Sequence, residues 1–516
     1  MEKKLVCIFV SMIMLTVTVF SAAGTMNDTK MLNGNHNVLS QRNERSSRNS
    51  DWLQIAKLNA SDAIPDNIFG FSVSIDGDYA VVGQDYTSFN GSAYIYKRDG
   101  TTWTQEAKLT ALDSALGNAF GYSVAINGNT VIIGAPGVIE WTGAAYIFTR
   151  TGTTWTQQAK LIASDGLIGD DFGFSVSING DYALIGASYA GTSWSGSAYV
   201  FKRTGTSWAQ EAKLSASDGQ PEDQYGWSVS ISGDTAVVGS VYDDARTGSA
   251  YVYTRSGTTW TDEKKLTASD PAIEDAFGVS VSIDGNTIVV GAGWKDTFIG
   301  AAYIYTRSGT TWTQEAKINA SDGTNGNEFG MAVSISGDTV VVGARFVNVW
   351  TGAAYIYSRT GTTWTEEARI NASDGQYFDQ FGWSVAIDGN YMIAGAPGET
   401  TTGAAYIFWK PIPQTPKLTI TLKGGFGLTI RVDNTGNANA TNVNVTCTVS
   451  GGLILFGKNT QQTISTIGVN QTDTFKTTIL GLGKTSMKVS AVCDEGVSVE
   501  RTANATVFII FVFGVT

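Results

Sequence analysis

The strongest constraint on this chain is an internal repeat of about 52 residues that occurs seven times. An aromatic residue followed by glycine marks each copy: Phe69-Gly70, Phe120-Gly121, Phe172-Gly173, Tyr225-Gly226, Phe277-Gly278, Phe329-Gly330 and Phe381-Gly382. A tryptophan series keeps the same register: Trp52, Trp103, Trp155, Trp208, Trp260, Trp312 and Trp364. Two markers repeated in one register indicate seven copies of one structural unit.

Each copy has the pattern of four short strands. In the third copy, Phe174 to Ile178 alternates apolar and small polar residues, and Asn179-Gly180 has the composition of a tight hairpin turn. Tyr182 to Ala187 and Ser197 to Lys202 continue the strand pattern, and the tryptophan segments complete it. Seven four-stranded units predict an all-β chain with a seven-bladed β-propeller over residues 51–410.

The phase of the repeats predicts how the ring closes. The chain enters the first copy through a tryptophan strand, Trp52 to Leu58, and the seventh copy ends after Ala405 to Phe408 without one. We therefore expect the first strand to complete the last blade, which leaves no open sheet edge between the two ends.

These motifs resemble the FG-GAP repeat family, which includes the propeller of integrin α subunits. The "GAP" half stands at Gly134-Ala135-Pro136 and Gly395-Ala396-Pro397. The resemblance, which is nearest to the variant found in prokaryotic surface proteins, implies a propeller that binds a partner outside the cell. The integrin-like calcium loop is replaced here by short turns such as Asp76-Gly77, which offer too few oxygens for calcium. No metal and no cofactor are therefore predicted.

Strand direction assigns the loops to two faces of the propeller. The face opposite the short turns carries the segments that differ between copies, and variable loops on a constant scaffold favour recognition. The candidate binding residues there are Tyr86, Phe89, Trp141, Tyr189, Trp194, Tyr242, Asp243, Asp244, Trp294, Phe298, Phe346 and Trp350. Exposed aromatic side chains are efficient anchors for proteins and sugar rings, although they could instead pack between blades.

The same face is expected to carry a ring of carboxylates, seven residues before each marker aromatic: Asp62, Asp113, Asp165, Asp218, Asp270, Asp322 and Asp374. One interpretation is a set of cation sites; the other is a turn in which the aspartate caps backbone N–H groups. No histidine or cysteine lies in the propeller, and no repeat carries a distinctive acid pair, so we predict no catalytic residues and no enzyme.

The amino-terminal segment has the pattern of an export signal. A basic start, an apolar run from Leu5 to Phe20 and small residues after it predict a signal peptide over residues 1–23, with an uncleaved anchor as the alternative. Residues 24–50 form a polar linker that holds the single histidine, His36. The mature protein is expected to be secreted or held at the cell surface.

Residues 411–417 form a proline-rich linker, and the strand pattern over 418–516 predicts an immunoglobulin-like β-sandwich. Its Asn/Gly-rich part resembles CARDB repeats of prokaryotic surface proteins. Cys447 and Cys493 are expected to form a disulfide, with two buried thiols as the alternative. The apolar segment Val507 to Val515 is too short to span a membrane and is predicted to be a buried last strand.

The propeller segment is strongly acidic, and the chain carries several possible glycosylation sequons. The segment between residues 50 and 413 holds 20 basic and 38 acidic residues, a net charge of −18 that argues against nucleic acid as a partner. This charge either attracts cations or a basic partner or serves solubility alone. The expected function is binding or adhesion, with an extracellular protein or glycan as the partner. The alternatives are a structural component of a surface layer or matrix and, less favoured, a secreted carbohydrate-active enzyme. Possible glycosylation sites are Asn27, Asn59, Asn90, Asn319, Asn371, Asn439, Asn444, Asn470 and Asn504.

Overall fold

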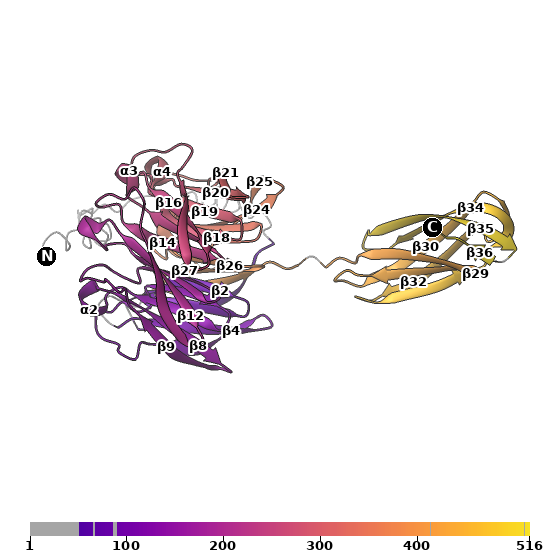
Figure 1. Cartoon of the computed structure of the whole chain (residues 1–516). Helices are drawn as coiled ribbons and strands as arrows, with labels where there is room; N and C mark the ends of the chain where they lie inside the picture. The colour runs from indigo at the N-terminus through magenta and orange to yellow at the C-terminus, as the bar shows by residue number, and fades with distance from the viewer. Residues whose placement is uncertain (1–50, 65–67, 86–89, 413, 510, 516) are drawn as a thin grey trace, which may run out of the picture. The chain divides into compact units, whose positions relative to one another are not determined.

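The computed structural model describes residues 51–515 except 65–67, 86–89, 413 and 510. The predicted signal peptide, the polar linker with His36, and Asn27 therefore lie outside the described residues. Seven four-stranded antiparallel sheets form the blades of a propeller, and one further sheet forms a carboxy-terminal domain (Figure 1). The chain is thus all-β, as the sequence predicts.

The first four blades follow one another along the chain. Blade 1 holds β2 (Ile68–Asp76), β3 (Tyr79–Asp85), β4 (Ser92–Asp99) and β5 (Thr102–Leu109). Blade 2 holds β6 (Ser123–Asn127), β7 (Thr130–Ala135), β8 (Ala144–Thr151) and β9 (Thr154–Leu161). Blade 3 holds β10 (Ser175–Asn179), β11 (Tyr182–Ala187), β12 (Ser197–Thr204) and β13 (Ser207–Leu214). Blade 4 holds β14 (Tyr225–Ser232), β15 (Thr235–Ser240), β16 (Ser249–Ser256) and β17 (Thr259–Leu266).

The last three blades keep the same order. Blade 5 holds β18 (Phe277–Asp284), β19 (Thr287–Ala292), β20 (Ala301–Ser308) and β21 (Thr311–Ile318). Blade 6 holds β22 (Ala332–Ser336), β23 (Thr339–Ala344), β24 (Ala353–Thr360) and β25 (Thr363–Ile370). Blade 7 holds β26 (Val385–Asp388), β27 (Tyr391–Ala396), β28 (Ala404–Trp409) and, from the start of the chain, β1 (Leu53–Leu58).

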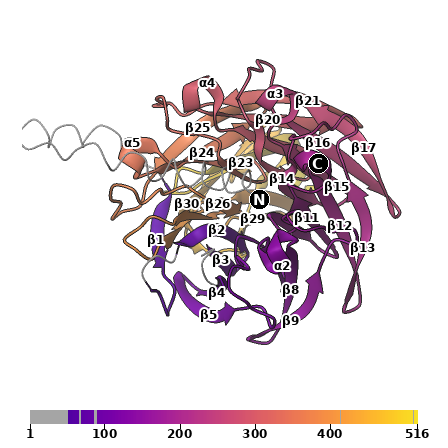
Figure 2. The same cartoon turned by 90° about the vertical axis from the view of Figure 1, so that its left-hand side faces the viewer.

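The pairing of β1 with β28 closes the ring. The register runs from Leu53 opposite Trp409 to Leu58 opposite Ala405, with a bulge between Gln54 and Ala56. Figure 2 shows the blades arranged about a common axis. The predictions of seven blades and of a closing first strand are both confirmed.

Burial explains why each repeat forms these strands. In blade 3, β11 (YALIGA) is buried along its whole length because neighbouring blades cover both of its faces, whereas β10 alternates buried and half-buried residues. Phe172, just before β10, packs edge-on against Tyr199 and Phe201 of β12. The same aromatic cluster recurs in each blade and forms the core of the wheel.

The two glycines of the repeat meet between neighbouring blades. A Cβ added to Gly186 in blade 3 would lie 2.0 Å from the carbonyl oxygen of Gly226 in blade 4. The equivalent contact recurs around the ring, and Gly395 of blade 7 faces the carbonyl oxygen of Gly70 in blade 1. The aromatic–glycine and glycine–alanine motifs are thus the two sides of one close backbone approach.

Hydrogen bonds form a closed ring where the first strands end. The residue before each hairpin glycine accepts a bond from the glycine N–H of the next blade. The donor and acceptor pairs are Gly128 and Asp76, Gly180 and Asn127, Gly233 and Asn179, Gly285 and Ser232, Gly337 and Asp284, Gly389 and Ser336, and Gly77 and Asp388. The seven acceptor residues, together with isoleucines that precede most of them, line an axial cavity of about 250 Å³. Aspartate, asparagine and serine occupy this position because each offers a side-chain acceptor.

The carboxy-terminal domain is a single curled sheet. Its strands are β29 (Leu418–Asn434), β30 (Ala440–Ser450), β31 (Leu453–Phe456), β32 (Asn459–Ile467), β33 (Thr472–Thr477), β34 (Leu480–Val492), β35 (Ser498–Ile509) and β36 (Phe511–Phe513). They pair in the order β32, β30, β34, β35, β36, β29 and β33, with β31 on β34. The two end strands, β32 and β33, are consecutive in the chain. The domain is therefore a nearly closed, barrel-like sandwich around an apolar core that includes Leu428, Val445 and Val489.

The expected disulfide is absent. Cys447 and Cys493 are both buried free thiols. Cys447 lies on β30, and Cys493 directly follows the neighbouring strand β34. However, Cys447 lies opposite Val489, four residues before Cys493. Four residues along a strand span about 13 Å, beyond the reach of a disulfide, so the prediction is wrong.

Among the described residues, no helix has both the length and the apolar character needed to cross a bilayer.

The glycine contact can be tested by substitution. We expect Gly186→Ala to lower the free energy of unfolding by about 3 kcal/mol, because its Cβ would overlap the Gly226 carbonyl. Gly180→Ala is the matched control, since its Cβ meets nothing within 4 Å and only the positive φ of 57° opposes it, at about 1 kcal/mol. Urea denaturation measures both. Equal losses would contradict the proposed close approach.

The cysteines can be tested by alkylation. Because Cys447 and Cys493 are free, both should react with iodoacetamide in guanidinium without any reductant. Peptide mass mapping measures the reaction, and a sample reduced beforehand is the control. A cross-linked peptide pair in the unreduced sample would show that a disulfide forms.

Candidate functional site

The propeller has two unlike faces. The hairpin face carries the short turns between the first and second strands and between the third and fourth strands of each blade, such as Gly180-Asp181 and Gly205-Thr206. The loop face carries the links between blades and the loops between second and third strands. Those loops contain α2 (Val138–Trp141), η1 (Thr192–Trp194), α3 (Asp243–Arg246), α4 (Lys295–Phe298) and α5 (Val347–Trp350).

The four-residue elements are single left-handed turns. Ile139, Glu140 and Trp141 all have φ between 48° and 68°, and α3, α4 and α5 repeat the pattern. This conformation is costly for residues other than glycine. The next blade compensates, because the Trp141 carbonyl accepts a hydrogen bond of 2.8 Å from Asp171 N, and the Thr142 carbonyl accepts one from Phe172 N. The loops are thereby fixed in one conformation.

Most of the aromatic residues predicted to bind are half-buried. The half-buried ones are Trp141, Tyr189, Trp194, Tyr242, Trp294, Phe346 and Trp350, whereas Phe298 is exposed. They pack on one another: Phe346 stacks on Trp350 with ring centroids 4.8 Å apart, and Tyr242 lies 5.9 Å from Trp294. Tyr86 and Phe89 lie outside the described residues.

A second set of aromatic residues lies nearer the axis. Phe71, Tyr122, Phe174, Trp227 and Trp383 each follow the glycine of the marker pair, and Val279 and Met331 occupy that position in the other two blades. Neighbouring rings touch around the axis, with centroids 4.8–5.5 Å apart between successive pairs. Sequence reasoning missed this ring. Its signal was an aromatic residue immediately after the marker glycine in five of the seven copies.

Sequence reasoning also missed the apolar side chains that are most exposed on the loop face. They lie in the left-handed turns and in the links between blades: Ile64, Leu112, Leu116, Ile139, Ile162, Leu167, Ile168, Ile273, Val349, Tyr377 and Phe378. The turn of one blade bonds to the link entering the next, so they gather at blade junctions. Ile139 lies in the turn of blade 2 that bonds to the link carrying Leu167 and Ile168, and Val349 lies in the turn of blade 6 that bonds to the link carrying Tyr377 and Phe378.

The ring of aspartates is held by protein groups. Each aspartate accepts hydrogen bonds from side chains of the blade that its link enters. Tyrosine hydroxyls donate in the pairs Tyr94 and Asp62, Tyr199 and Asp165, Tyr251 and Asp218, Tyr303 and Asp270, Tyr355 and Asp322, and Tyr406 and Asp374. A basic residue of the outer strand forms an ion pair with each: Lys108, Lys160 (with Asp113), Lys213, Lys265, Lys317, Arg369 and Lys57. The ion pair between Lys57 of β1 and Asp374 thereby joins the closing strand to the link that enters blade 7.

The capping role belongs to a different residue. Two residues before the marker aromatic, an aspartate or asparagine accepts a bond from the backbone N–H three residues earlier. The cases are Asp170 with Leu167, Asp223 with Gln220, Asp275 with Ala272, Asn327 with Thr324, and Asp379 with Gln376. The capping turn was thus predicted correctly in kind but at the wrong position.

Buried charged residues on the loop face form ion pairs. Asp243 is buried and ion-paired with Lys265 at 2.6 Å, whereas Asp244 is exposed. Lys295 and Asp275 are both buried and lie 2.8 Å apart. Burial raises the pKa of Asp223, which lies near Asp243. Within the described ranges, no group of three or more His, Cys, Asp or Glu side chains is arranged to hold a metal ion.

The possible glycosylation sites differ in access. Asn59, Asn319, Asn371, Asn439, Asn470 and Asn504 are exposed, whereas Asn90 and Asn444 are half-buried. Asn444 also accepts a hydrogen bond from Gln461. Exposure makes the first six the sites open to modification.

The repeats of the propeller match a known protein family. The model described as "FG-GAP repeat" matches residues 52–96, 103–148, 155–201, 208–253, 260–305, 312–357 and 364–408. The chain belongs to the FG-GAP repeat family. Each FG-GAP match begins at a tryptophan of the series, so it covers the outer strand of one blade and the first three strands of the next. FG-GAP repeats and blades therefore interlock around the ring.

No curated protein matches the chain. Among solved structures, the chain is similar to Sqt1 of Saccharomyces cerevisiae, at 10% identity and a TM-score of 0.39. That match covers 74% of this chain and 97% of the Sqt1 chain.

The aspartate ion pairs predict a loss of stability in acid. Burial opposes ionisation of Asp270, but its bonds with Lys317 and Tyr303 and the charge of Lys295 outweigh burial and lower its pKa to about 2. Because this pKa lies below the value of about 3.9 for an unfolded chain, the stabilisation is present above about pH 4 and is lost as the pH falls towards 2. Asp270→Asn should flatten the pH dependence of the urea midpoint over this range.

The control for this experiment is Asp181→Asn, which removes an exposed ion pair with Arg203 on the hairpin face. We expect this variant to follow the unsubstituted protein. An unchanged pH profile for Asp270→Asn would contradict the role given to the Asp270 ion pairs.

Proposed function

We propose that this FG-GAP protein is an extracellular or cell-surface binding protein whose loop face contacts a protein or a glycan. The observation that carries the proposal is the contrast between the faces. The hairpin face repeats one short turn, whereas the loop face varies in sequence and gathers exposed apolar side chains at blade junctions. Exposed apolar groups on a rigid frame are typical of recognition surfaces.

Rigidity supports the same function. The left-handed turns are bonded to the following blade, and the half-buried aromatic residues hold the loop bases together. A partner would therefore meet a surface that needs little ordering, which favours affinity. The apolar groups give contact area, and the half-buried rings of Trp141 and Trp350 give planar surfaces suited to apolar side chains or sugar faces.

Binding is favoured over catalysis by the state of the acidic residues. The aspartates of the loop face accept bonds from tyrosine, lysine and backbone groups. The single histidine of the sequence, His36, precedes the propeller. Glycoside hydrolysis would need a pair of carboxylates facing a substrate, whereas these carboxylates face their own blade. The export pattern of residues 1–23 supports a location outside the cell.

The proposal predicts that removing one apolar junction weakens binding. The triple variant Ile139→Ser, Leu167→Ser and Ile168→Ser should lower affinity at least about tenfold, because three exposed apolar contacts are lost. All three side chains are exposed, so the fold should persist. Binding to a glycan array and to an array of purified surface proteins measures the effect.

The matched control is Leu53→Ser, an exposed apolar side chain on the outer strand β1. It should bind as the unsubstituted protein does. If neither array retains the unsubstituted protein, or if the triple variant binds equally well, the loop face is not the recognition surface. Turnover of a polysaccharide would instead support a carbohydrate-active enzyme.

A further inference from the structure

Five exposed apolar residues lie directly opposite one another across five strands of the carboxy-terminal domain. The register pairs Leu453 with Leu482, Leu482 with Phe508, Phe508 with Phe511, and Phe511 with Phe426. In the order Leu453, Leu482, Phe508, Phe511 and Phe426, they are 60%, 48%, 58%, 43% and 67% exposed. The rings of Phe426 and Phe511 lie 5.8 Å apart. We refer to these five residues as the apolar row.

The apolar row is not part of an incomplete core. On the same strands, Val507 and Val512 point inward and are buried, and they belong to the core of the domain. The expectation of a buried last strand is therefore half right, because Val507 and Val512 are buried whereas Phe508 and Phe511 are exposed. A continuous exposed row of leucine and phenylalanine is uncommon on a soluble domain and marks an interaction surface.

Lysines flank the apolar row. Lys423 lies three residues before Phe426, and Lys484 lies two residues after Leu482 on the same side of β34. Lys458 lies two residues after Phe456, another exposed residue of β31. All three lysines are exposed, and the described residues place no carboxylate in an ion pair with them.

The carboxylates of the domain lie farther away. On β29, Asp433 is seven residues beyond Phe426, and on β35, Glu500 is eight residues before Phe508. At about 3.3 Å per residue, these separations are roughly 23 and 26 Å. The apolar row thus lies in a positively charged surrounding, unlike the acidic propeller.

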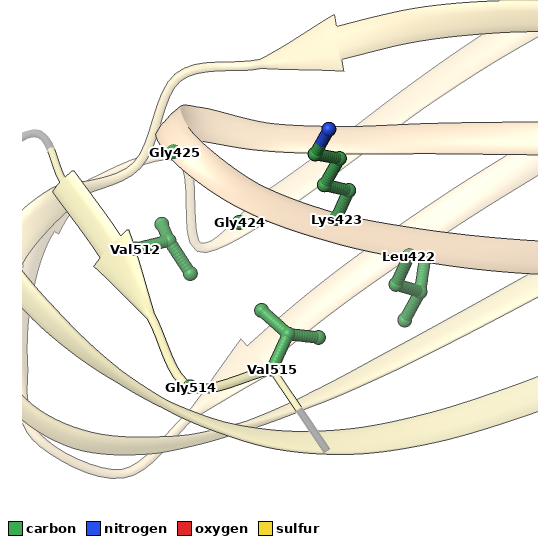
Figure 3. A pocket seen from close by; sticks show the side chains of 7 residues that line it. All are labelled: Leu422, Lys423, Gly424, Gly425, Val512, Gly514 and Val515. Carbon is green, nitrogen blue, oxygen red and sulfur yellow. The ribbon is translucent and has the colours of Figure 1, made fainter.

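An open hollow of about 360 Å³ lies at the same end of β29 and β36, although none of the five row residues lines it. It is lined by Leu422, Lys423, Gly424, Gly425, Val512, Gly514 and Val515. Figure 3 shows Leu422, Val512 and Val515 on one side of the β29 ribbon and the Lys423 amine pointing to the other side. One wall is therefore apolar, and a cation stands at its rim.

We propose that the apolar row and its lysines bind the surface of a membrane that contains anionic lipids. Phenylalanine and leucine side chains enter the boundary between headgroups and acyl chains, and Lys423, Lys458 and Lys484 contact lipid phosphates. Charge favours this partner over a second copy of the chain, because two facing rows would bring like-charged lysines together. The domain would then hold the propeller at a membrane, a role separate from recognition by the loop face.

Vesicle sedimentation of the full chain tests the proposal. The protein should sediment with phosphatidylglycerol vesicles more than with phosphatidylcholine vesicles, and added salt should weaken the binding. Phe508→Ser with Phe511→Ser should lower partitioning at least about tenfold, because two inserted rings are lost. Lys423→Glu with Lys484→Glu should remove the preference for phosphatidylglycerol. The apolar segment Leu5 to Phe20 is present in every variant, so the differences between variants carry the result.

Two control variants are matched to these changes. Lys488→Glu alters an exposed lysine on the same strand that is already paired with Glu500, and Leu53→Ser removes an exposed apolar side chain from the outer strand β1 of the propeller. Both controls should bind vesicles as the unsubstituted protein does. Unchanged partitioning of the row variants would overturn the proposal. So would self-association, measured by analytical ultracentrifugation, that the row variants abolish while vesicle binding is unaffected.

Discussion

The close approach of two backbones between neighbouring blades is the constraint on which the propeller depends. The carbonyl of the glycine in the aromatic–glycine pair occupies the space where the glycine of the preceding blade would carry a side chain, as between Gly226 and Gly186. This contact sets the spacing of the blades, so that Phe172 of blade 3 packs in one core cluster with Ile132 and Ile147 of blade 2. The hydrogen bonds between hairpins and the aspartate ion pairs further stabilise this arrangement of blades. The arrangement is possible only because the glycines carry no side chain.

The fold could be predicted from sequence because its determinants are local and repeated. The alternation of β10, the Asn179-Gly180 turn and the tryptophan register each specify a strand or a turn within one copy, and sevenfold repetition removes ambiguity. The closing strand was predicted from the phase of the repeats alone, and β1 pairs with β28 as expected. The disulfide failed for the complementary reason: the stagger of β30 against β34 is a tertiary property that spacing between cysteines does not contain.

The candidate site was less predictable, because exposure depends on what packs above a residue. Trp141 and Trp350 were expected to be exposed on the loops. In the structure each ends a left-handed turn and is half-buried, whereas Leu167 and Ile168, in a link between blades, are exposed. Asp165 was expected to cap a turn, yet its partners are Tyr199 and Lys213, which are more than thirty residues away in the chain. Repetition in the sequence shows that a residue type recurs at a position, and the structure shows which neighbouring residues contact it.

The position of β1 has a consequence for how the molecule is made. Leu58 leaves the ribosome before any blade is complete, yet its partner, Ala405, is among the last propeller residues to be synthesised. Blades 1 to 6 can form in order as their strands emerge, because each is continuous in the chain. The seventh sheet must wait with an unpaired edge until both termini of the wheel are in the same compartment, so any interruption of synthesis or transport before that point yields an open arc that is prone to pairing with other chains.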